Sequence, residues 1–287
     1  MTPTLVRQHR THAGAKPRVD LCARARDWSE IQERMLVPLY EAVYERLEVG
    51  TGTRLLALGC GSGLSLLMAA SRGAAVTGVE HSSPERLALA RERLLPDTWG
   101  ARARADVRIV DGPPGDLGAA GGAETPPYTL VTAFEPIGWA GDSEGVGGLL
   151  RAAIPLAERG APVVLTGWGP PERCATASVL RVAGKLADPL RGAGGTRPAL
   201  RDGLEEVAQR SGLRPDGSGR VACPFGYADT DSALRGLLST GLFDAAITAT
   251  DRTQVNKELT EALHPYVRGD GTVWMHNVFR YLIARVP

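Results

Sequence analysis

The sequence predicts an α/β fold in which a doubly wound, mostly parallel sheet is covered by helices. Two observations carry this prediction: short apolar runs alternate with helical segments along most of the chain, and the first apolar run leads into a glycine-rich loop. Alternating strands and helices are typical of parallel sheets, because neighbouring parallel strands need a long crossover connection between them. At 287 residues the chain is long enough for one large domain or two modest ones.

The first predicted element is a helix over residues 25–49. Asp27 is its expected N-cap, and Gly50 and Gly52 are expected to end it. Its apolar side chains recur every three or four residues, as in an amphipathic helix: Trp28, Ile31, Met35, Leu39, Val43 and Leu47. Residues 1–24 lack this pattern and are expected to form a flexible arm, and they contain no apolar core typical of a secretion signal.

Strands and helices are then predicted in alternation. Strands are expected at residues 53–59, 74–80, 107–110, 128–134, 161–168 and 221–227, and helices at 64–71, 84–94, 145–160 and 200–213. Pro84 after Ser83 is typical of a helix start. The glycine-rich segments 115–127 and 189–198 are expected to be surface loops.

The C-terminal part is predicted to add a helical insertion and one more strand. Residues 228–271 contain two helical patterns, at 234–246 and 254–267. The last segment, residues 272–286, is β-rich and follows no crossover helix, so we expect it to run antiparallel near the sheet edge. The N-terminal helix and the insertion are expected to form a helical lid, and residues 25–287 to form a single domain.

Composition disfavours several classes of function. Lys and Arg number 33 against 32 Asp and Glu, so the net charge of +1 would not recruit a nucleic acid. No run of about 18 uncharged apolar residues is present to span a membrane. The four cysteines, Cys22, Cys60, Cys174 and Cys223, form no CxxC pair, so we expect no metal site, no disulfide framework and a reducing cytoplasmic location.

The glycine-rich loop at residues 59–63 is the strongest functional signal. Gly59, Gly61 and Gly63 follow a predicted strand directly, and glycines let the backbone approach a ligand closely. The GxGxG spacing differs from the GxGxxG of dinucleotide sites, and no GK[ST] of a Walker loop follows. Glu80 ends the next strand, where a carboxylate can accept hydrogen bonds from both ribose hydroxyls of a nucleoside.

These residues resemble the class I S-adenosylmethionine-dependent methyltransferases, in particular the small-molecule subgroup of the type 11/25 kind. The first motif of that subgroup reads hhDhGCGxG, and its second strand ends in Asp or Glu before a Ser-Pro helix start. This chain has LLALGCGSG at 55–63 and GVEHSSPERLALARERL at 78–94. The resemblance extends from Trp28 to the last strand, and it implies a Rossmann-like sheet with S-adenosylmethionine as cofactor and S-adenosylhomocysteine as product.

The resemblance and the strand ends also suggest individual roles. The cofactor would be bound by the glycine loop, by strand ends and by the N-terminal helix: Gly59, Cys60, Gly61, Ser62, Gly63, Glu80, His81, Asp111, Gly112, Phe134, Trp28 and Gln32. The candidates for a general base are, in order, Glu135, His276 and His81. Candidates to contact the substrate are Trp139, Trp168, Asn277 and Tyr40, although packing onto the sheet explains Tyr40 equally well.

Two positions depart from the family pattern. Ala57 stands where the family has an acidic residue that anchors the amino end of the cofactor, and Pro113 stands where an adenine-contacting Asp is usual; Asp111 or Glu135 could compensate. Loss of one charge-assisted hydrogen bond costs about 1.5–3 kcal/mol, so cofactor binding would be weaker or differently oriented.

The leading hypothesis is an enzyme of secondary metabolism that methylates a small acceptor, by attack of an O, N or C atom on the sulfonium methyl group. The alternatives are a cyclase or another non-methylating enzyme that retains the cofactor structurally, and a noncatalytic partner protein. The sequence leaves open whether the chain forms a homodimer or binds a biosynthetic partner enzyme.

Overall fold

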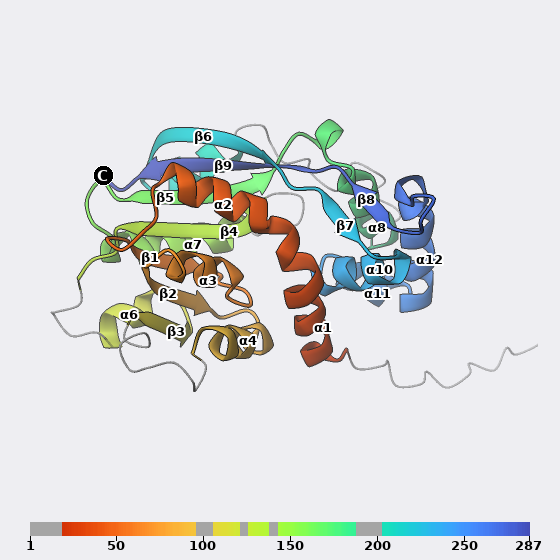
Figure 1. Cartoon of the computed structure of the whole chain (residues 1–287), viewed down its shortest axis with the longest axis horizontal. Coiled ribbons are helices and arrows are strands. Elements are labelled where there is room, and N and C mark those ends of the chain that lie inside the picture. Colours follow the sequence, from red (N-terminus) through yellow and green to blue (C-terminus); the bar gives the residue numbers. More distant parts are fainter. Residues whose placement is uncertain (1–18, 96–105, 121–125, 138–142, 188–202) are drawn as a thin grey trace, which may run out of the picture.

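A mostly parallel sheet forms the centre of the computed structural model (Figure 1), which describes residues 19–95, 106–120, 126–137, 143–187 and 203–287. Seven described strands make this sheet: β1 (Arg54–Leu58), β2 (Ala75–Glu80), β3 (Val107–Asp111), β4 (Leu130–Ile137), β5 (Pro162–Trp168), β6 (Arg214–Ala222) and β9 (Val278–Arg285). Their order is β3-β2-β1-β4-β5-β9-β6. The strands from β3 to β5 are parallel, and β9 is antiparallel to both β5 and β6. The doubly wound sheet and its antiparallel last strand are therefore confirmed.

Helices cover both faces of the sheet. They are α2 (Val37–Arg46), α3 (Leu64–Ala70), α4 (Pro84–Leu94), α6 (Gly115–Ala120), α7 (Ser143–Ala153), α8 (Thr176–Ala187) and α9 (Gly203–Arg210). Leu55 of β1 belongs to the same apolar cluster as Leu66 of α3, whereas its neighbour Leu56 belongs to the cluster that contains Leu150 of α7 and Val207 of α9. Successive strand residues thus face opposite layers, as buried parallel strands require.

Two helices differ from the sequence prediction. Helix α6 begins at Gly115, inside the segment 115–127 that we expected to be a loop. Helix α8 was not predicted, although half of its residues are buried and it packs on the C-terminal helices. The other expected loop, residues 189–198, lies outside the described part of the chain.

The N-terminal helix begins earlier than predicted and is irregular. Helix α1 (Leu21–Asp27) starts after Asp20, whose side chain accepts a hydrogen bond from the backbone of Ala23 at 3.0 Å. Asp27 is therefore not the N-cap, and residues 21–24 do not belong to an arm. A π-helical turn, Trp28–Gln32, and a 3₁₀ turn, Glu33–Leu36, follow before α2.

Two predicted strands are each divided in the structure. The expected strand 221–227 becomes the end of β6 and a separate β7 (Phe225–Tyr227), and the expected strand 272–286 becomes β8 (Val273–Met275) and β9. Strands β7 and β8 pair as a second, two-stranded sheet. The break coincides with Pro224, which has no backbone N–H to donate, and with Asn277, whose side-chain oxygen accepts from the backbone of Thr176 at 3.1 Å.

The predicted insertion 228–271 is helical. It contains α10 (Thr230–Ser239), α11 (Asp244–Ala249) and α12 (Arg252–Leu263). Helices α11 and α12 pack on α8, whereas α10 contacts α1 and the π-helical turn (Figure 1). Within the described ranges, no helix combines the length and apolar character needed to cross a membrane.

The packing around Gly78 of β2 makes a test of this architecture. A Cβ atom there would lie 2.5 Å from Leu66 Cδ1 and 2.9 Å from the Cβ and Sγ atoms of Cys60. We expect Gly78→Ala to lower the free energy of unfolding by about 1–3 kcal/mol, measured by urea denaturation, because overpacked cores must shift. Gly115→Ala is the control, since a Cβ at Gly115 meets nothing within 4 Å. Equal stability of the two variants would contradict the close packing of α3 on β2.

Candidate functional site

A cleft opens where the carboxyl ends of β1, β2 and β4 meet the N-terminal helices. The empty space in and above it, open solvent included, is about 370 Å³. Ligands of doubly wound sheets bind at this end of the strands. The lining residues are Trp28, Glu33, Leu36, Tyr40, Gly59, Cys60, Gly61, Ser65, Glu80, Arg86 and Phe134.

The floor of the cleft is the glycine loop, whose backbone only glycine adopts easily. Gly59, Gly61 and Gly63 have φ angles of 68°, 57° and 81°. The backbone N–H groups of Gly59 and Cys60 both donate to the carbonyl of Val79, at 3.0 and 3.1 Å, which holds the loop on β2. Burial, with smaller contributions from nearby carboxylates, raises the pKa of the Cys60 thiol to about 12, so this cysteine is not a nucleophile.

Glu80 presents a fixed carboxylate at one end of the cleft. Its side chain is only 3% exposed. One carboxylate oxygen accepts from the backbone N–H of Ser82 at 2.8 Å, and the other accepts from Gly61 at 3.3 Å. The first oxygen also accepts from the Ser82 hydroxyl at 2.5 Å. A carboxylate oxygen accepts two hydrogen bonds, so the oxygen on Gly61 can bind one ligand hydroxyl directly, and the other can bind a second when the Ser82 hydroxyl rotates away.

A buried polar cluster joins the N-terminal helices to the glycine loop. The Glu33 carboxylate accepts hydrogen bonds from the hydroxyl and the backbone N–H of Ser62, and from Arg93 at 3.1 Å. Arg93 also donates to Ser29 Oγ at 2.7 Å. Burial raises the pKa of the Glu33 carboxyl, whereas the Ser62 hydrogen bond and the Arg93 charge oppose that rise.

The sequence prediction missed Glu33, Ser29 and Arg93. The expected apolar stripe contains Trp28, Ile31 and Met35, which are only half-buried, whereas the fully buried face of this segment is Ser29, Gln32, Glu33 and Leu36. That face has the i, i+3, i+4, i+7 spacing of a helix. The signal was therefore present, but its residues are mostly polar and a search for apolar periodicity passes over them.

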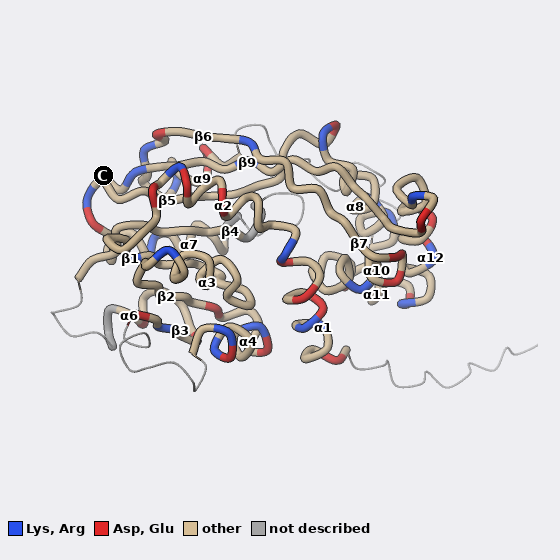
Figure 2. Tube along the Cα trace, viewed as in Figure 1, with Lys and Arg blue, Asp and Glu red and all other residues tan. Residues whose placement is uncertain are grey.

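Aromatic side chains form the other wall of the cleft. The rings of Tyr40 and Phe134 lie 4.8 Å apart, centroid to centroid. The guanidinium of Arg86 stacks 4.1 Å above the Trp28 ring and donates to the carbonyl of Ser239 at 3.1 Å, at the end of α10. These contacts connect the N-terminal helices, α4 and the insertion. Charged side chains of both signs lie on α1 and α4 (Figure 2).

The structure gathers part of the predicted set around the cleft. Trp28, Tyr40, Gly59, Cys60, Gly61, Glu80 and Phe134 line it. Ser62 and Gly63 belong to the loop but do not line the cleft: Ser62 lies in the polar cluster and Gly63 packs against Ala90 and Leu94. Gln32 accepts from the Tyr227 hydroxyl at 3.0 Å and does not line the cleft.

Other predicted residues lie elsewhere. His81 is exposed beyond Glu80, and Asp111 and Gly112 end β3 without lining the cleft. His276 is also exposed, on the outer side near Trp274. Trp168 packs on Phe279 and Phe225, and the Asn277 side chain is used at the start of α8. The structure does not describe the side chain of Glu135, and Trp139 lies outside the described residues.

No protein-family model matches the sequence, and neither does any curated protein. Solved structures do share its fold. A putative methyltransferase from Bacillus halodurans is 13% identical, covering 86% of this chain and 98% of that chain with a TM-score of 0.53. YjhP from E. coli is 19% identical, covering 93% and 100% with a TM-score of 0.50.

A geranyl diphosphate methyltransferase, solved in complex with S-adenosylmethionine, is 16% identical and covers 92% of this chain and 90% of its own, with a TM-score of 0.50. These structures match this chain over most of its length. The chain therefore has the Rossmann-like fold of the class I S-adenosylmethionine-dependent methyltransferases.

Proposed function

We propose that the cleft binds S-adenosylmethionine and that the chain transfers its methyl group to a small, apolar or aromatic acceptor of the natural-product type. The observation that carries this proposal is the buried Glu80 carboxylate beside the glycine loop, at the carboxyl end of β2. A shared fold alone does not imply a shared activity, so the proposal depends on this local arrangement.

The lining residues fit such a cofactor. Glu80 Oε2 has a free acceptor position for one ribose hydroxyl, and Oε1 can accept from the second in exchange for the Ser82 hydroxyl. Gly59 and Gly61 have no side chain to block the approach of a ligand to the backbone. Among the described residues, the buried Nε1 atom of Trp28 has no hydrogen-bond partner, which leaves a donor for a ligand. The aromatic rings of Tyr40 and Phe134 provide apolar contact on the opposite wall.

S-adenosylmethionine supplies a methyl group on a positively charged sulfur, which is intrinsically electrophilic. The residues of this chain then contribute mainly alignment and exclusion of water. Leu36, Tyr40 and Phe134 are suited to that task, since they line the cleft with apolar atoms. Glu135 follows Phe134 directly in β4 and is the leading candidate to accept a proton from the acceptor, because His81 and His276 do not line the cleft.

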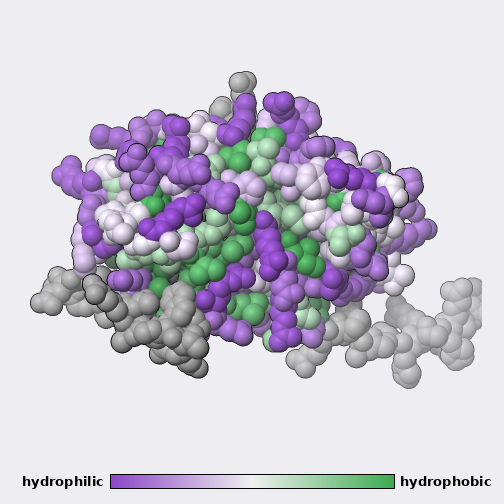
Figure 3. Space-filling model, in the orientation of Figure 1, coloured by the Kyte–Doolittle hydropathy of each residue, from purple (hydrophilic) through white to green (hydrophobic). Residues whose placement is uncertain are grey.

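The acceptor class is suggested by the apolar character of the surface around the N-terminal helices. Figure 3 shows hydrophobic surface on both sides of the polar band that these helices form. Apolar surface beside a cleft with few polar groups is typical of small-molecule sites.

A second candidate is a non-methylating enzyme, such as a cyclase, that keeps the cofactor as a structural element. It is favoured by Ala57, a buried residue that leaves β1 without a carboxylate. This alternative predicts a product that is isomeric with the substrate, and no S-adenosylhomocysteine.

The proposal is tested by calorimetric titration of the whole chain with S-adenosylmethionine and S-adenosylhomocysteine, followed by assays of S-adenosylhomocysteine release with apolar and aromatic acceptors. We expect micromolar dissociation constants and release with at least one acceptor. No binding at millimolar ligand would overturn the proposal. Binding with an isomerised product and no release would favour the second candidate.

A further inference from the structure

Glu33 brings an ionisable group into the cleft that the proposed function has not yet used. Its carboxylate is 2% exposed. Oε2 accepts from the Ser62 hydroxyl and from Arg93, whereas Oε1 accepts from the backbone N–H of Ser62 at 3.2 Å and from no other group of the described residues. A carboxylate oxygen accepts two hydrogen bonds, so Oε1 retains one acceptor position on the side of the cleft.

The Nε1 atom of Trp28, which has no partner among the described residues, lies beside Gly61 as Glu33 Oε1 does. A Cβ atom built on Gly61 would lie 3.0 Å from Glu33 Oε1 and 3.5 Å from Trp28 Nε1. An acceptor and a donor from the N-terminal helices therefore lie close together beside Gly61, and all three residues line the cleft. The buried Trp28 N–H, which has no partner among the described residues, is costly to leave without a ligand, because an unsatisfied buried polar group loses its hydration.

The charges around this place are unequal. Arg93 pairs with the Glu33 carboxylate at Oε2, at 3.1 Å, and leaves Oε1 as the oxygen that faces the cleft. Arg86, which also lines the cleft, has its guanidinium 4.1 Å from the centroid of the Trp28 ring. A positive ligand group is thus favoured beside Glu33, and a negative one beside Trp28 and Arg86. A primary ammonium and a carboxylate on one carbon atom match this pair, which describes the end of an α-amino acid.

We propose that Glu33 and Trp28 bind the α-amino acid end of the ligand, with the ammonium donating to Glu33 Oε1 and the carboxylate accepting from Trp28 Nε1. This inference rests on the proposed function, since the nucleoside end is assigned to Glu80. It also explains how the chain manages without an acid at Ala57: the carboxylate comes from the N-terminal helices rather than from β1. Glu33 and Trp28 are accordingly ligand-binding residues.

Three ligands separate the two ends of the site in calorimetric titrations. S-adenosylhomocysteine has both amino-acid charges, its decarboxylated form keeps only the amine, and 5′-methylthioadenosine has neither. We expect wild-type protein to bind S-adenosylhomocysteine at least tenfold more tightly than 5′-methylthioadenosine. We expect Glu33→Gln to lower the affinity for S-adenosylhomocysteine and for its decarboxylated form about tenfold to hundredfold. The affinity for 5′-methylthioadenosine should stay within twofold of that of the wild type.

Trp28→Phe keeps the ring beneath Arg86 and removes only the N–H. It should lower the affinity for S-adenosylhomocysteine about fivefold to thirtyfold and leave the affinity for the decarboxylated ligand unchanged. Glu30→Gln, an exposed position on the same segment, and Trp274→Phe, outside the cleft, are matched controls that should bind every ligand as wild type does.

The outcomes distinguish this inference from the proposed function. If wild-type protein binds 5′-methylthioadenosine as tightly as S-adenosylhomocysteine, the inference is overturned and the nucleoside site stands. Equal weakening of all three ligands by Glu33→Gln overturns it too, because Glu33 would then act only through the fold. If Glu33→Gln does not fold, the inference is tested by two other measurements. They are the ratio of the wild-type affinities for S-adenosylhomocysteine and 5′-methylthioadenosine, and the affinities of Trp28→Phe. Failure of all three ligands to bind overturns the proposed function and this inference with it.

Discussion

Replacing Glu80 with alanine is expected to lower the affinity for both S-adenosylhomocysteine and 5′-methylthioadenosine by about 10²–10⁴-fold. Two charge-assisted hydrogen bonds to the ribose are lost, each contributing about 1.5–3 kcal/mol. The loss is shared by both ligands because the nucleoside is common to them, whereas the effect of Glu33→Gln should appear only with ligands that carry the amine. Calorimetric titration measures both effects on the same scale.

Two further variants control this experiment. Glu80→Gln keeps the shape of the side chain and one acceptor oxygen, so we expect a smaller loss of about tenfold. Glu92→Ala removes an exposed carboxylate from α4, outside the cleft, and should leave binding unchanged. Wild-type affinity in Glu80→Ala would rule out the assignment of the nucleoside to this end of the cleft.

Phe279→Ala is expected to lower the free energy of unfolding by about 3–5 kcal/mol, the usual cost of deleting a fully buried aromatic side chain. Phe279 is 0% exposed, and its ring centroid lies 4.5 Å from that of Trp168 and 6.1 Å from that of Phe225. It therefore joins the start of β9 to β5 and to the small sheet. Urea denaturation measures the loss.

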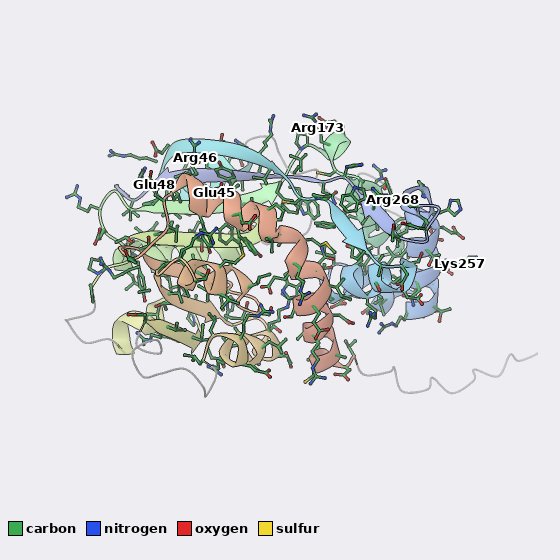
Figure 4. All side chains as sticks on the ribbon, in the orientation of Figure 1. Glu45, Arg46, Glu48, Arg173, Lys257 and Arg268 are labelled. Carbon is green, nitrogen blue, oxygen red and sulfur yellow. The ribbon has the colours of Figure 1, made fainter. Side chains whose placement is uncertain are left out.

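Trp274→Ala is the matched control for that experiment. Trp274 is half-buried on β8 and stacks beneath Arg268. Figure 4 shows Arg268 near Lys257 at the outer end of the helical region, far from Glu45, Arg46 and Glu48. We expect a loss of about 1 kcal/mol, because a half-exposed ring buries less apolar area. If the two variants lose equal stability, the aromatic cluster around Phe279 does not connect the two sheets as described.

The parallel part of the sheet could be predicted from the sequence because its strands are buried on both faces and appear as unbroken apolar runs. Helix α4 was predicted with the correct bounds, since Ser83 caps it and Pro84 starts it. Strand β6 was largely missed, because RPDGSG at 214–219 has the composition of a turn. It is an edge strand, where proline and glycine are tolerated and where β9 supplies the pairing.

The candidate site was predicted where a motif is local and missed where residues meet through tertiary packing. The glycine loop and Glu80 are close in sequence, and their strand–loop–helix setting fixes their geometry. Glu33 and Arg93 are 60 positions apart and meet through an ion pair. The buried face of the N-terminal segment is mostly polar, so a search for apolar periodicity did not identify Ser29 or Glu33.

The direction of β9 determines how the protein can be attached to a surface. Because β9 runs antiparallel to β5, Arg285 pairs with Pro162 at the start of β5. The C-terminus therefore lies at the amino ends of the parallel strands, whereas Glu80 and the glycine loop lie at their carboxyl ends (Figure 1). A biotin or fluorophore joined after Pro287 would leave the cleft facing away from a sensor chip. A tether on the N-terminal side would enter through α1, next to the Trp28 wall, and would perturb the association rates it was meant to report.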